Sequence, residues 1–144
     1  MNARLKGTLL GIVTAMVGIV VFVGLGMADI ISGWASIIMV MGFMVVYSLI
    51  AKTDRGPYMY IVGVTVSVVF LIIAEIILIA LVCQEHGIDL EFALQHAEIK
   101  DAMIQDLIFA FVFVILGVVL GHFQVKRIDK LRKPATDEVK VENN

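Results

Sequence analysis

The sequence predicts an all-α integral membrane protein, a four-helix bundle whose spans leave both chain ends on the cytoplasmic side. Of its 144 residues, 60% are hydrophobic and 17% are charged. Soluble domains are roughly 45–50% apolar and about 25% charged. Mean hydropathy is +1.00, and most of the apolar residues stand in four long runs that are almost free of charge. A soluble domain this small has too little interior to bury so much apolar surface.

Four spans are expected, at about residues 7–28, 30–51, 57–84 and 106–125. A helix needs about 20 apolar residues to cross a hydrocarbon core of about 30 Å, and each run is long enough. Backbone groups in lipid must be paired within their own segment, which makes the runs helices. The first run exceeds the apolar core of about 7–15 residues in a signal peptide, so we interpret it as a retained span. One transmembrane domain is predicted over residues 1–133.

The connection between the third and fourth spans is predicted to contain a short amphipathic helix outside the cell. Apolar residues from Leu90 to Ile104 recur at helical spacing. Asp89 is placed to cap the start of this helix, and Glu91 suits its first turn, where the helix dipole is positive. This helix either covers the bundle or uses its acidic face to recruit cations or a basic partner.

The distribution of basic residues predicts the orientation in the membrane. Of 11 Lys and Arg residues, all but Lys100 lie before the first span, between the second and third, or after the fourth. The connection between the third and fourth spans is acidic. Because cytoplasmic loops are enriched in Lys and Arg, both termini are expected in the cytoplasm of a multi-pass protein of the cell inner membrane.

A basic cluster directly follows the fourth span and is expected to contact anionic lipid headgroups. Pro134 is expected to stop any helix there. Residues 134–144 are short and polar, and we predict a disordered cytoplasmic tail. The residues of the basic cluster are Lys126, Arg127, Lys130, Arg132 and Lys133.

Small residues mark the faces through which the helices pack, because helices in lipid associate by close packing. The first span carries such a stripe at spacings of four, four and three, and the fourth span carries two glycines four apart. These stripes pack either within one chain or against a second copy in a homo-oligomer, and the sequence leaves both alternatives open. The residues concerned are Gly7, Gly11, Ala15, Gly18, Gly117 and Gly121.

Glu75 is the one charged residue in the interior of a predicted span, since Asp106 stands at the boundary of the fourth, and it is the candidate functional residue. A carboxylate in hydrocarbon is costly and often marks an ion or proton pathway. Ser36 of the second span lies at a similar depth, with Trp34 above it, and both are expected to offer hydrogen-bond donors. Glu75 is either a proton- or cation-linked site or a protonated carboxyl that bonds a neighbouring helix. The second alternative is favoured by the apolar residues that precede Glu75 on its face, which are Val64, Val68, Leu71 and Ile72.

Several function classes are excluded by what the sequence lacks. The net charge of −2 excludes a generally basic nucleic-acid-binding protein. No phosphate-binding loop, nucleophile motif or paired catalytic carboxylates are present, so we expect no enzyme and no cofactor. Metal-ligating residue types gather near the outer end of the third span, but their spacing matches no structural zinc site and no metal is predicted. These residues are Cys83, Glu85, His86 and His96.

Over roughly residues 7–121 the chain resembles a family of small four-span membrane proteins common in Firmicutes. The matching motifs are Gly7-Thr8-Leu9-Leu10-Gly11, Val46-Tyr47, Ala74-Glu75, Gly87-Ile88-Asp89, and Asp106-Leu107 followed by Gly117. The chain departs from the family in lacking a glycine before Tyr47, an aromatic residue after Glu75 and the cysteine-rich zinc ribbon of some members. The resemblance implies a membrane location and draws attention to Glu75, but it implies no activity.

Two functions remain open from the sequence. The first is a small oligomeric transport or channel-like component in which Glu75 is the titratable centre. The second is a non-catalytic accessory or regulatory membrane protein that binds a partner through helix packing or through its acidic outer loop. The lipid bilayer is the one partner that both functions require.

Overall fold

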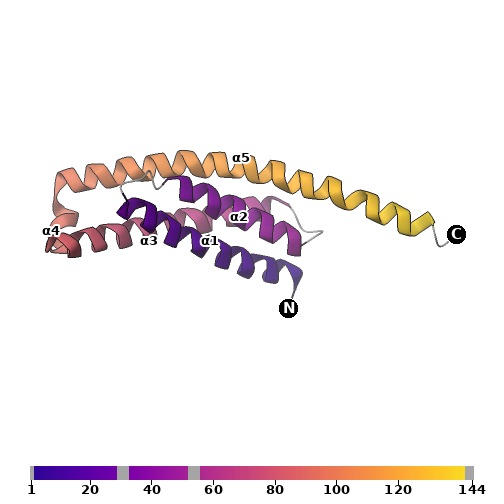
Figure 1. The fold of residues 1–144 in the computed structure, drawn as a ribbon, viewed down its shortest axis with the longest axis horizontal. Coiled ribbons are helices and arrows are strands. Elements are labelled where there is room, and N and C mark those ends of the chain that lie inside the picture. Colours follow the sequence, from indigo (N-terminus) through magenta and orange to yellow (C-terminus); the bar gives the residue numbers. More distant parts are fainter. Residues whose placement is uncertain (1, 29–32, 52–55, 142–144) are drawn as a thin grey trace.

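The computed structural model describes residues 2–28, 33–51 and 56–141, without the side chains of 132–141. Within these residues all regular secondary structure is helical and no strand occurs, which confirms the all-α prediction (Figure 1). The helices are α1 (Ala3–Met27), α2 (Trp34–Ile50), α3 (Pro57–His86), α4 (Leu90–Gln95) and α5 (Ala97–Val141).

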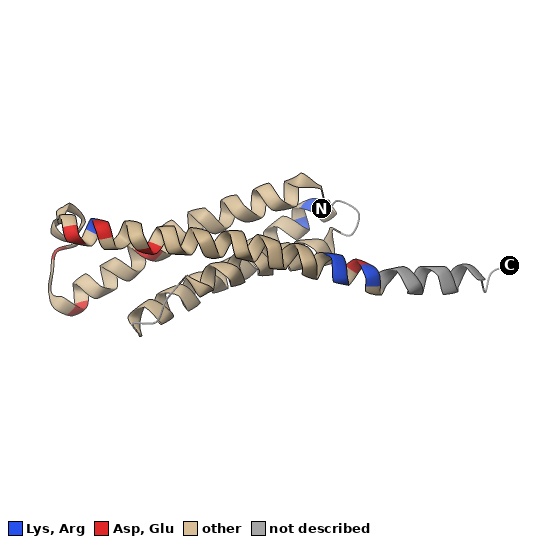
Figure 2. Cartoon of the chain, turned by 90° about the horizontal axis from the view of Figure 1, so that it is seen from above, with Lys and Arg blue, Asp and Glu red and all other residues tan. Residues whose placement is uncertain are grey.

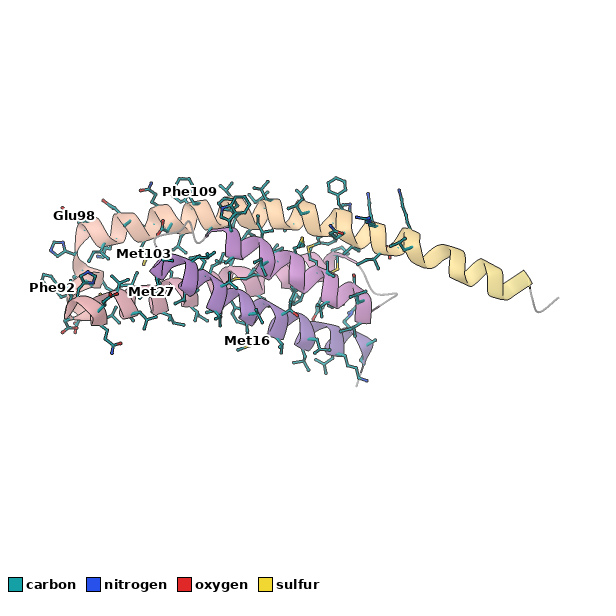
Figure 3. All side chains as sticks on the ribbon, viewed as in Figure 1. Met16, Met27, Phe92, Glu98, Met103 and Phe109 are labelled. Carbon is teal, nitrogen blue, oxygen red and sulfur yellow. The ribbon has the colours of Figure 1, made fainter. Side chains whose placement is uncertain are left out.

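The helices α1, α3 and the Ala97–Leu131 part of α5 are each long and apolar enough to span a membrane. Large apolar side chains cover their outer surfaces. Met16 of α1 and Phe109 of α5, for example, point outward from opposite sides (Figure 3). Such an apolar exterior is what a lipid environment requires, and it supports the prediction of a membrane protein.

The second predicted span is shorter than expected in the described residues. α2 has 17 residues, which rise roughly 26 Å at about 1.5 Å per residue. The hydrocarbon core is about 30 Å thick. The first residues of the predicted span at 30–51 lie outside the described part of the chain.

α2 lies at the centre of the helix packing. It packs most extensively against α1 and then against α5, while α3 packs against α1 and less extensively against α2 and α5. No contact joins α1 to α5 within the described residues. The buried core therefore follows α2, whose largest fully buried side chains are Tyr47, Phe43, Met39, Met44 and Val40.

The small-residue stripe of α1 faces α2. A Cβ atom on Gly11 would stand 2.7 Å from a ring carbon of Phe43, and one on Gly18 would overlap Met39 Cγ. At these two positions the absence of a side chain allows the helices to approach so closely. The buried small residues of this face are Gly7, Gly11, Ala15 and Gly18.

The two glycines of α5 face the other side of α2. A Cβ atom on Gly117 would stand 3.1 Å from the backbone Cα of Ile37, and one on Gly121 would stand 2.8 Å from Met44 Sδ. Both small-residue stripes are therefore occupied by α2 of the same chain. We refer to these α1–α2 and α2–α5 interfaces together as the small-residue contacts.

The helix boundaries at the acidic end differ from the prediction. Asp89 caps α4 as expected, because its Oδ1 accepts a hydrogen bond of 3.1 Å from the backbone N–H of Glu91. The helix does not continue to Ile104 but ends at the extended residue His96, and the following residues belong to α5. The last long helix thus begins at Ala97 rather than near residue 106, because no Gly or Pro interrupts it before the apolar run.

The helix stop expected at Pro134 is wrong, because α5 continues to Val141. A proline inside a helix removes one backbone donor and crowds the carbonyl of the preceding turn, but it does not end α5. The last three residues of the predicted tail lie outside the described part of the chain.

Charged residues are separated along the long axis of the molecule. The basic start of α1 and the mostly basic stretch of α5 lie toward one side, while most of the acidic residues lie around α4 at the opposite end (Figure 2). The basic residues concerned are Arg4 and Lys6 of α1 and Lys126, Arg127 and Lys130 of α5. The loop residues Lys52 and Arg55 lie outside the described residues, as do the side chains of Arg132 and Lys133.

Candidate functional site

Glu75 is buried in α3 without a hydrogen bond at one of its oxygens. Its side chain is 3% exposed, and Oε2 has no partner. It is the only buried charged residue among those that the structure describes. A buried polar group that lacks a partner costs free energy. Few other polar side chains are buried among the described residues. Glu75 is therefore the strongest candidate for a functional residue.

The ends of α3 determine the depth of Glu75. Pro57 occupies the first turn, where its missing N–H is not needed, and Gly87 ends the helix with a φ of 66°. That positive φ is the left-handed conformation that glycine adopts without steric cost. Glu75 lies eleven residues before His86, which is roughly 16 Å below the acidic end of the helix.

Ser36 and Trp34 do not join Glu75. The Ser36 hydroxyl contacts the carbonyl oxygens of Gly33 and, at 3.0 Å, of Ala110 in α5. Trp34 packs on Phe113 of α5 at a ring-centroid distance of 5.0 Å, and its side chain is 56% exposed. Both residues belong to the α2–α5 interface. The hydrogen bond expected between them and Glu75 is not found, because equal depth does not specify which way a helix is rotated.

A hydrogen bond that the sequence analysis did not identify joins α3 to α5. Tyr60 Oη lies 2.6 Å from His122 Nδ1, and both side chains are half-buried. The two residues are 62 positions apart, and neither stands in a recognisable motif, so no signal in the sequence pairs them. This bond fixes the register of the two helices near their basic end.

An apolar groove with a volume of about 400 Å³ follows the same interface, which we call the α3–α5 seam. The groove opens outward, because Ile108 is 60% and Phe111 is 52% exposed. All of its lining residues are apolar. They are Val68, Leu71 and Ile72 from α3, and Ile104, Leu107, Ile108, Phe111 and Val112 from α5.

Glu75 is level with this groove. The residues Val68, Leu71 and Ile72 precede it by seven, four and three positions, so all four lie on one face of α3. The helices α3 and α5 run in opposite directions (Figure 1). Glu75 and the groove residue Leu107 are each about fifteen residues from the Tyr60–His122 bond, which places them at the same height.

The charged side chain that acts electrostatically on Glu75 is also acidic. Asp106 of α5, which is exposed, interacts repulsively with the Glu75 carboxylate. In the part of the chain that the structure describes, the Lys and Arg residues lie at the start of α1, near the start of α5 and after its apolar run, and none lies within an apolar run (Figure 2). The charged residue that influences Glu75 is therefore acidic, not basic.

The metal-ligating residue types near the acidic end do not form a site in the described structure. No group of three or more His, Cys, Asp or Glu side chains that could hold a metal ion occurs among the residues described. Cys83 is a buried free cysteine, and His86 Nδ1 lies 2.9 Å from the carbonyl oxygen of Val82 in its own helix.

Comparisons with known proteins found no similar protein: no family model, no curated protein and no solved structure matches the chain. The resemblance noted from the short motifs therefore stays a prediction. The function must be argued from the geometry of the seam and from Glu75.

Proposed function

We propose that this protein is a small multi-pass transport component of the cell inner membrane in which Glu75 binds a proton or another cation. The observation that carries this proposal is the burial of Glu75 Oε2 without a partner inside a long apolar helix. Intramembrane carboxyl groups without a structural partner occur chiefly along ion and proton pathways. The repulsion from Asp106 gives the site a further preference for a positive ligand.

The proposed topology is a four-helix bundle of four spans with both termini in the cytoplasm. It is supported by the basic residues at the end of the molecule where α1 begins and by those in the last part of α5. The shorter α2 would span with local thinning of the bilayer, which costs a fraction of a kcal/mol per Å of mismatch. The basic cluster after α5 would then contact anionic headgroups.

The working unit is proposed to be a homo-oligomer. The buried polar side chains of the described chain are Ser36, Ser48, Ser67 and Glu75, which do not form a continuous polar path through one copy. The small-residue contacts are occupied within the chain, so association would use other faces, which are apolar and exposed.

The test is a measurement of charge movement on the full chain reconstituted in liposomes, recorded on a solid-supported membrane after a jump in pH or cation concentration. Glu75→Gln is expected to reduce the transported charge at least tenfold. Glu85→Gln removes an exposed carboxyl at the end of the same helix and should leave the signal unchanged. Equal signals from the wild type and Glu75→Gln would refute the transport role of Glu75.

A second candidate function is favoured by the apolar character of the interior. The lining of the groove contains no polar side chain, which suits an accessory protein that binds a membrane partner better than it suits a water-filled conduit. The acidic end, where Glu98 and Phe92 point outward (Figure 3), offers such a partner a surface. A wild-type protein that moves no charge in the same assay would favour this second function.

A further inference from the structure

We propose that the groove of the α3–α5 seam binds a lipophilic cation, whose apolar part fills the groove and whose positive charge lies at Glu75. The expected ligand is an amphiphile with a bulky apolar body and a quaternary or delocalised cationic centre. This assignment rests on the proposed function, because it names the substrate class of the same carboxyl group.

The groove suits the apolar part of such a molecule. Its volume of about 400 Å³ lies within the range of about 300–1,000 Å³ that is typical of small-molecule sites. Every lining side chain is apolar. Because Ile108 and Phe111 are half exposed on the outer surface of the helices, a ligand would enter from the surrounding lipid rather than from water.

Glu75 is not itself a lining residue, but it follows the lining residues Leu71 and Ile72 by one helical turn on the same face of α3. Side chains on a helix lean toward its N-terminus and cover the preceding turn. The preceding turn of Glu75 is formed by Leu71 and Ile72, which line the groove. The side chain is 3% exposed with an unpartnered Oε2, so a buried acceptor lies on the groove-lining face of α3, one turn beyond Leu71.

The electrostatics of the site select a cation over a neutral or anionic molecule. A second negative group, Asp106, acts on Glu75 from α5, and charges interact more strongly in the low dielectric of a membrane interior than in water. A lipid acyl chain would fill the groove but would bring no positive charge to the Glu75 carboxylate. An anion would be repelled by that carboxylate. The ring of Phe111 in the lining adds a π face that attracts cations.

The experiment compares two ions of the same shape and opposite charge. Tetraphenylphosphonium and tetraphenylborate are titrated separately against the purified full chain in nanodiscs of uncharged lipid. Tetraphenylphosphonium is expected to bind at least tenfold more tightly than tetraphenylborate. Glu75→Gln should weaken tetraphenylphosphonium binding at least tenfold and leave tetraphenylborate binding unchanged or stronger, whereas Glu85→Gln should alter neither.

A second variant fills the groove without touching the carboxyl. Ile108→Trp replaces an exposed groove residue, so it is expected to preserve folding and to weaken tetraphenylphosphonium binding at least tenfold. If Glu75→Gln does not fold, this variant and Glu75→Asp decide the question. Equal binding of the two ions, or undiminished cation binding in Ile108→Trp, would overturn the proposal and leave the groove as a place for lipid alone.

The outcome separates this site from the proposed transport function. Charge movement that depends on Glu75, without binding of tetraphenylphosphonium, would refute the lipophilic-cation site and keep the transport role. Binding that depends on Glu75, with no charge movement in liposomes, would keep the site and refute transport.

Discussion

The small-residue contacts and the α3–α5 seam differ in how closely the paired helices pack. In the small-residue contacts, glycines let α1 and α5 approach α2 until a single added carbon would collide with its side chains or backbone. In the seam, branched and aromatic side chains hold α3 and α5 apart around a groove of about 400 Å³. Because attraction between helices in lipid comes from close packing, the first region supplies stability and the second leaves room for a ligand.

The largest difference is expected when a side chain is added to the small-residue contacts. In Gly18→Leu the new side chain collides with Met39. Overpacking of this kind lowers the free energy of unfolding by about 1–3 kcal/mol. Gly24→Leu is the matched control, because no atom lies within 4 Å of a Cβ placed at Gly24. The free energy of unfolding in mixed micelles should fall for the first variant and change by less than about 1 kcal/mol for the second. Similar losses in both would show that the stripe of α1 does not hold the fold.

A smaller difference is expected between two buried serines. The Ser36 hydroxyl bonds the Ala110 carbonyl across the α2–α5 interface, so Ser36→Ala should cost about 1 kcal/mol of unfolding free energy. Ser67 of α3 is equally buried but its Oγ has no partner, so Ser67→Ala should be neutral or slightly stabilising. The same unfolding measurement checks both variants, and a larger loss for Ser67→Ala would contradict this account of the interior.

The smallest effect is expected in the groove itself. Ile72→Phe enlarges a half-exposed lining residue at a place where space remains. Its unfolding free energy should stay within about 0.5 kcal/mol of the wild type, as for most exposed positions away from special features. A loss comparable to that of Gly18→Leu would show that the seam is as tightly packed as the small-residue contacts.

The difference between the two regions also explains which parts of the site the sequence could predict. Glu75 stood out because a single carboxyl in a long apolar run is conspicuous in any membrane helix. The Tyr60–His122 bond and the electrostatic effect of Asp106 on Glu75 were not predicted. These contacts depend on the register between two antiparallel helices, and no local pattern in either helix specifies that register.

The prediction that Ser36 and Trp34 bond Glu75 was wrong for a related reason. Ser36 has the hydroxyl and the depth that were expected, but the rotation of α2 turns it toward Ala110 of α5. Helix depth follows from counting residues along one helix. Helix rotation follows from which faces pack most closely. The rotation of α2 is set by its packing against the glycines of α1 on one side and of α5 on the other.

The sequence by itself determined the helical class of the described chain, the long apolar helices, the Asp89 cap and the separation of basic from acidic ends. These features follow from local chemistry: backbone pairing in an apolar solvent, the capping of free N–H groups and the positions of charges along the chain. Only the tertiary structure decided which helix each glycine stripe meets and where an apolar groove remains between α3 and α5. Those outcomes depend on the shapes of several faces fitted together, and no single helix contains that information.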